Sequence, residues 1–99
     1  MIVIRNVFQL KFGKAREALA VMKEGVTIQK RLAPDASARL LTDVTGPFYT
    51  LVLELTVPGL AAFEATAPKV FGDPEFQANY QKMASLVESG RREIFTIVD

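Results

Sequence analysis

Few side chains in this sequence can do chemistry, because it contains no cysteine and no histidine. Thiolate nucleophiles and disulfides are therefore excluded, and the commonest general base and metal ligand is missing. Among the remaining polar residues, Arg5, Glu54 and Glu93 each lie within an alternating apolar segment. A carboxylate kept partly dry by such segments can have a raised pKa and act as a general base.

The same three residues admit a simpler interpretation. If they meet on one face of a sheet, Arg5 can be flanked by both carboxylates, and a buried charge needs such a partner whether or not it is catalytic. The sequence leaves both interpretations open. The acidic residues Asp35, Asp43 and Asp99 are scattered, so we expect no metal site, and no motif implies a cofactor.

A second candidate site combines one amide with aromatic rings. Asn6 falls among apolar residues, where its amide must find hydrogen-bond partners. Aromatic walls with a few polar groups are typical of small-molecule pockets, although an ordinary core has the same composition. The candidate ligand-binding residues are Asn6, Phe8, Tyr49, Phe63, Phe71, Phe76 and Tyr80.

Four segments are expected to be strands. Residues 48–57 alternate most clearly, with leucine and valine at every second position and Glu54 on the opposite side. Residues 1–10 alternate in the same way, with Asn6 and Phe8 on one face and Arg5 on the other. Residues 36–44 and 91–99 complete the set.

Two long helices and one short helix are expected between the strands. Apolar residues recur three and four apart over residues 14–32, where Gly13 is a possible N-cap and Gly25 weakens the middle by about 1 kcal/mol relative to alanine. Residues 60–67 form a short helix that should stop before Pro68, followed by a loop at 70–72.

The last helix has clear start and stop signals. Asp73 and Pro74 are a strong start, the apolar spacing continues to Ser89, and Gly90 is a typical C-terminal cap. Arg91 and Arg92 are then expected to interact with the helix C-terminus.

The element order is β-α-β-β-α(α)-β, the ferredoxin-like pattern of an α+β fold, and residues 1–99 form one domain. The first and third strands should be central, with all helices on one face of an antiparallel sheet. The other face then exposes Val3, Val7, Val52, Phe95 and Ile97, more apolar surface than a monomer usually tolerates. We therefore expect a homodimer that closes a dimeric α/β barrel.

Charge and hydropathy exclude other partners. The net charge is +1, with no basic stripe, so nucleic-acid binding is not expected. No apolar segment is long enough to cross a membrane, and the N-terminus lacks a basic region before its apolar residues. A cytoplasmic protein that does not bind membranes is the expectation.

Three segments resemble the dimeric α/β-barrel superfamily, and most closely the small bacterial NIPSNAP-type proteins. They are NVFQLKFGKAREAL, TGPFYTLVLELTVPGLAAFE and DPEFQANYQKMASLVESGRREIFTIV, which together cover most of the chain. They are structural segments and contain no catalytic signature, so the resemblance implies a fold and no particular reaction.

The superfamily also implies alternatives for function. It includes antibiotic-biosynthesis-type monooxygenases, whose first strand can carry an active-site asparagine, and Asn6 resembles that residue in position. Its haem-degrading members need a tryptophan and a histidine, which this sequence lacks. We expect binding of a small apolar or aromatic molecule between sheet and helices. The alternatives are a cofactor-independent monooxygenase or isomerase, and a non-catalytic protein-interaction module.

Overall fold

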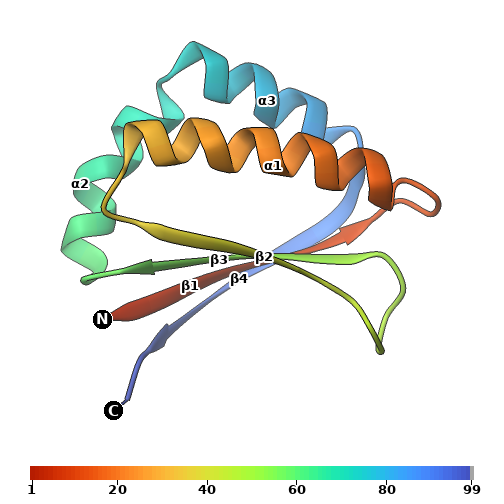
Figure 1. The fold of residues 1–99 in the computed structure, drawn as a ribbon, viewed down its shortest axis with the longest axis horizontal. Coiled ribbons are helices and arrows are strands. Elements are labelled where there is room, and N and C mark those ends of the chain that lie inside the picture. Colours follow the sequence, from red (N-terminus) through yellow and green to blue (C-terminus); the bar gives the residue numbers. More distant parts are fainter. Residues whose placement is uncertain (99) are drawn as a thin grey trace.

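The computed structural model describes residues 1–98, which form a four-stranded antiparallel sheet with three helices on one face (Figure 1). This is the ferredoxin-like α+β arrangement predicted from the sequence. The elements in chain order are β1 (Ile2–Leu10), α1 (Ala15–Leu32), β2 (Ser37–Thr42), β3 (Thr50–Val57), α2 (Leu60–Phe71), α3 (Pro74–Ala84) and β4 (Val87–Thr96).

The strands lie in the order β2-β3-β1-β4, so β1 and β3 are central, as predicted. In this register Arg5 lies between Glu54 on β3 and Glu93 on β4. Asn6, one residue later, lies beside Arg92 on β4. Because successive strand residues point to opposite faces, these two neighbourhoods lie on opposite sides of the sheet.

The core lies between the sheet and α1. On the sheet, Ile4 and Leu51 are fully buried. On α1, the buried residues recur at spacings of four, three and three, which places them on one side of the helix: Ala18, Met22, Gly25 and Ile28. Helix α3 begins as predicted, because the Asp73 side chain accepts a 3.0 Å hydrogen bond from the backbone N–H of Phe76.

Two helix boundaries differ from the sequence prediction. Helix α2 continues through Pro68 to Phe71, where a loop was expected. Proline removes one N–H donor but keeps its carbonyl, which accepts a 2.9 Å hydrogen bond from Gly72 N–H and closes the last turn. The buried side chain of Val70 anchors that turn. The N-cap residue of α1 is Lys14, not Gly13, and its side chain makes no capping hydrogen bond. Gly13 lies in the preceding turn at φ 76°.

The largest error concerns residues 85–90, which were predicted to end α3 and cap it. Helix α3 ends at Ala84, and β4 begins at Val87. Val87, Ser89 and Gly90 pair with β1, and these strand hydrogen bonds outweigh the helical spacing of the segment. Gly90 is a strand residue opposite Phe8, where an added Cβ would lie 3.1 Å from Phe8 Cδ1.

A register shift in β4 determines which of its side chains reach the core. Gln9 pairs with Ser89, but Leu10 pairs with Val87, so Glu88 is an extra residue. Such a bulge changes the face to which the following residues point. Val87 consequently packs against the core, while Glu88 is exposed.

No element of residues 1–98 covers the second face of the sheet (Figure 1). The expected residues occupy it: Val7 and Val52 are buried among their neighbours, while Phe95 and Ile97 are about half exposed. Within residues 1–98, no helix combines the length and the hydropathy that a membrane span requires.

Candidate functional site

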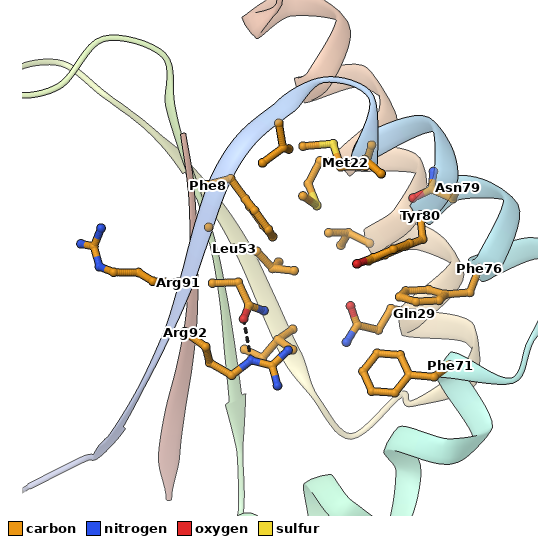
Figure 2. A pocket seen from close by; sticks show the side chains of 18 of the residues that line it. Phe8, Met22, Gln29, Leu53, Phe71, Phe76, Asn79, Tyr80, Arg91 and Arg92 are labelled. Atoms are coloured by element: carbon orange, nitrogen blue, oxygen red, sulfur yellow. Dashed lines mark hydrogen bonds between the residues drawn. The ribbon is translucent and has the colours of Figure 1, made fainter. Parts of the chain in front are cut away.

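A cavity of about 560 Å³ lies between the sheet and the helices (Figure 2). The space is left open because α3 packs mainly on α1 and makes few contacts with β1 and β4. Helices α1, α2 and α3 and strands β1, β3 and β4 all contribute to the wall. Apolar lining residues from these elements include Phe8, Met22, Val26, Leu53, Phe76 and Met83.

Six of the seven residues proposed as a ligand site line this cavity. Asn6 and Phe8 come from β1, Phe63 and Phe71 from α2, and Phe76 and Tyr80 from α3. They converge because the inward positions of β1 face the helices that carry the other rings. The rings of Phe71 and Phe76 lie 5.7 Å apart at their centroids.

Tyr49 lies elsewhere. It precedes β3 in a turn with φ 60°, and its ring packs edge-on against Phe12 with centroids 5.0 Å apart. Both rings border a separate hollow beside the first turns of α1. The expected strand 48–57 would have continued the alternation through Tyr49, but the strand begins only at Thr50.

The structure adds Arg92 to the site. Its Nε–H donates a 2.8 Å hydrogen bond to Oδ1 of Asn6, drawn as a dashed line in Figure 2. Its guanidinium also lies 5.8 Å from the ring centroid of Phe63. The expected interaction of Arg92 with a helix C-terminus is wrong, because α3 ends at Ala84 and Arg92 lies well inside β4. The contact between Asn6 and Arg92 could not be predicted from the sequence, because it depends on the register of β1 against β4.

Further amides line the cavity. Gln29 lies on α1, facing Phe71 and Phe76 in Figure 2. Asn79 on α3 is buried, and its Nδ2 donates a 2.9 Å hydrogen bond to the carbonyl oxygen of Val21. A Cβ on Gly25 would lie 2.5 Å from Asn79 Oδ1, so the glycine permits this approach of α3 to α1.

The cavity's only charged side chain among residues 1–98 is that of Arg92. Arg91 also borders it, but the Arg91 side chain extends from the opposite face of β4 (Figure 2). No aspartate or glutamate lines the cavity. Among the same residues, no three acidic side chains gather closely enough to hold a metal ion. The cavity can therefore bind, orient and stabilise negative charge, but it offers no carboxylate base.

A row of alternating charges crosses the other face of the sheet. Glu54 accepts hydrogen bonds from Arg39 Nε at 2.7 Å and from Arg5 Nε at 2.9 Å. Arg5 also donates from Nη1 to Glu93 at 2.9 Å. The predicted meeting of Arg5 with both carboxylates is therefore present. Arg39 was not predicted, although it lies between Ala38 and Leu40, whose packing on the core side places Arg39 on the other face of β2.

These contacts determine the protonation of Glu54. The hydrogen bond from Arg39 lowers the pKa of the Glu54 carboxyl below its ordinary value; burial opposes the shift, and Arg5 adds to it. A general base with a raised pKa was one expectation for Glu54, and the direction here is the opposite. Glu54 is a satisfied anion in an ion-pair row.

Neither a protein-family model nor a curated protein significantly matches the sequence. Solved structures do match. A NIPSNAP family protein from Agrobacterium tumefaciens superposes with a TM-score of 0.89 at 22% identity, covering 99% of this chain and 86% of that chain. A NIPSNAP domain protein from Burkholderia xenovorans gives 0.86 at 20% identity, covering 99% and 95%.

A crystal structure of an antibiotic biosynthesis monooxygenase is also similar, with a TM-score of 0.76 at 17% identity over the full length of both chains. At these identities the similarity is one of fold. The resemblance inferred from the sequence is confirmed at that level: this chain folds like NIPSNAP family proteins and, more distantly, like antibiotic biosynthesis monooxygenases.

Proposed function

We propose that this protein binds a small apolar or aromatic molecule in the cavity between its sheet and its helices. The observation that carries the proposal is the cavity itself, about 560 Å³ with aromatic walls and an amide, Asn6, facing inward. Ligand pockets commonly have volumes of roughly 300–1,000 Å³ and combine apolar walls with a few polar groups. An interaction module without a ligand would be expected to fill this space with side chains.

A fluorescence titration with N-phenyl-1-naphthylamine, an uncharged aromatic probe, tests the proposal. Saturable binding with one site per chain is expected. Gln29→Phe, which places a ring at the cavity wall, should abolish it, whereas Thr27→Phe on the exposed side of α1 should not. If the probe does not bind, or binds equally to both variants, the cavity is not a ligand site.

The second part of the proposal is a homodimer that covers the open sheet face. The apolar residues there, such as Phe95, favour burial, and the charge row is complementary to a second copy of itself. A two-fold axis parallel to the strands reverses the row in the partner, so that each arginine faces a glutamate. Sedimentation equilibrium should give twice the chain mass. The interface between the two copies should bury more than about 1,200 Å² in total. A folded monomer at micromolar concentration would contradict it.

A second candidate function is a cofactor-independent oxygenation or isomerisation of the bound molecule. The position of Asn6 in the cavity wall favours it, because an amide N–H can stabilise the enolate oxygen of a ligand that has lost its proton to solvent. The test is oxygen uptake with anthrone, an enolisable aromatic ketone. The protein should raise the uptake rate, and Asn6→Ala should lower it to the rate without protein. An unchanged rate with the wild-type protein would leave ligand binding as the function.

A further inference from the structure

We infer that the ligand of this cavity is an anion: an apolar or aromatic acid whose oxyanion is bound by Arg92. The inference rests on the proposed function, since it names the class of molecule that the cavity takes. It concerns Arg92, which reaches the cavity only through the pairing of β4 with β1.

The first support is the charge of the cavity. Arg92 is the one charged side chain on its wall within residues 1–98, and no carboxylate of that wall balances it. The other polar groups there, such as Asn6 and Gln29, are neutral amides. Arg92 is exposed, so a neutral ligand that filled the cavity would remove only the water on the cavity side of the guanidinium, but it would replace none of those hydrogen bonds, which is unfavourable. An anionic ligand replaces them.

The second support is that Arg92 is held in position without being neutralised. Its Nε–H is engaged by Asn6 Oδ1, a neutral acceptor 2.8 Å away. No carboxylate of residues 1–98 forms an ion pair with it, whereas Arg5, Arg39 and Arg91 on the opposite face are all paired with glutamates. The hydrogen bond to Asn6 occupies one of five guanidinium N–H groups, which leaves the Nη groups for a ligand.

The third support is the shape of the donor group. A guanidinium presents parallel N–H groups that match the two oxygens of a carboxylate, and charged hydrogen bonds of this kind are stronger than neutral ones. The aromatic ring of Phe63, 5.8 Å away, lies against the same cation. An aromatic acid therefore satisfies both parts of the wall, with its ring among the aromatic side chains and its oxyanion at Arg92.

Two fluorescent probes that differ by one charged group test this inference. Anilinonaphthalene-8-sulfonate carries a sulfonate that N-phenyl-1-naphthylamine lacks, and the ring systems are the same. Arg92→Gln should weaken binding of the sulfonate by about tenfold to a hundredfold, as expected for charged hydrogen bonds. It should change the affinity for the uncharged probe by less than about threefold, since it leaves the apolar wall in place.

Arg91→Gln is the matched control, because it removes the same charge one residue away on the opposite face. Both affinities should stay at the wild-type values. The inference is overturned if Arg92→Gln leaves the sulfonate affinity unchanged, or if Arg91→Gln lowers it equally. Binding of the uncharged probe to the cavity would in that case still support the proposed function.

A competition assay on the wild-type protein gives an answer even if Arg92→Gln fails to fold. With N-phenyl-1-naphthylamine bound, 2-naphthoate should displace the probe at a concentration at least tenfold lower than 2-naphthamide, which has the same rings and no charge. Equal displacement by the two compounds would overturn the inference while leaving the ligand site intact. A bound probe that neither compound displaces would also overturn the inference. Failure of the probe itself to bind would remove the proposed function as well.

Discussion

Oδ1 of Asn6 accepts a hydrogen bond from Nε of Arg92 at 2.8 Å, which joins two residues that are 86 positions apart in the chain. They are direct partners in the pairing of β1 with β4, so the contact depends only on the register of two adjacent strands. The amide orients the guanidinium and leaves its charge in place.

Asn6→Asp should convert this contact into an ion pair. The new carboxylate would neutralise Arg92, so the affinity for anilinonaphthalene-8-sulfonate should fall at least tenfold while N-phenyl-1-naphthylamine still binds. Because Arg92 is exposed, the gain in unfolding free energy at neutral pH should stay below about 1 kcal/mol. Fluorescence titration and urea denaturation measure the two effects. Unchanged sulfonate binding would argue against a role for Arg92 in the cavity.

Gly25→Ala should destabilise the protein, although alanine is the better helix former. The new methyl group would lie 2.5 Å from Asn79 Oδ1, and moving that side chain breaks its hydrogen bond to Val21. We expect a loss of about 1–3 kcal/mol in the free energy of unfolding.

The sign should reverse once the clash is removed. In an Asn79→Ala background, Gly25→Ala should stabilise α1 by up to about 1 kcal/mol, the propensity difference in a helix interior. A double-mutant cycle by urea denaturation checks both values. If Gly25→Ala had the same effect in both backgrounds, the contact with Asn79 would not explain the glycine.

Arg5 and Arg39 bind the same carboxylate but should contribute unequally. Arg5→Met should lower the free energy of unfolding by about 1.5–3 kcal/mol, because the Arg5 side chain is 32% exposed and touches two glutamates. Arg39→Met should lower it by less than Arg5→Met does, because the Arg39 side chain is 73% exposed within one chain and contacts only Glu54. Both are measured at one fixed protein concentration, because the proposed dimer would make the free energy of unfolding depend on concentration. Equal losses would show that burial does not determine the strength of these pairs.

Low pH should lower the free energy of unfolding, partly because Glu54 becomes protonated. Its pKa is lowered from an ordinary value of 4.5 by Arg39 and then Arg5, so the folded state favours the ionised form. The resulting stabilisation is fully present above pH 4.5 and is lost as the pH falls through the lowered value.

Glu54→Gln should therefore have a flatter decline of unfolding free energy below pH 4.5 than the wild type. Glu88→Gln, at an exposed residue of β4, serves as the control and should follow the wild-type curve. Urea denaturation from pH 7 to pH 3 provides the comparison. Parallel curves for Glu54→Gln and the wild type would contradict the lowered pKa.

The strands could be predicted because their alternation has a physical cause. One face of the sheet packs on helices, so Ile4 and Leu51 had to fall on one side, with Arg5 and Glu54 on the other. The helical layer was harder to predict at its ends. The segment after Ala84 has helical spacing and a glycine stop signal, which together predict a longer helix. The segment instead pairs with β1, and the local sequence does not show that pairing.

In the candidate site, too, local sequence patterns predicted some residues, whereas the positions of others depend on contacts between distant segments. Asn6 was recognisable as an amide among apolar residues, and most of the aromatic rings followed from the faces of the elements that carry them. Arg92 was missed because its place depends on a register across the sheet, and Tyr49 was misplaced because its backbone leaves the strand at φ 60°.

The alternation along β1 and β4 has an evolutionary consequence. Arg5 and Asn6 are neighbours in sequence, as are Arg91 and Arg92, yet one residue of each pair belongs to the ion-pair face and the other to the cavity. Inherited changes at alternate positions therefore act on different surfaces and accumulate independently. Related chains can therefore differ in the molecule that binds in the cavity between sheet and helices, while the residues of the opposite face stay the same.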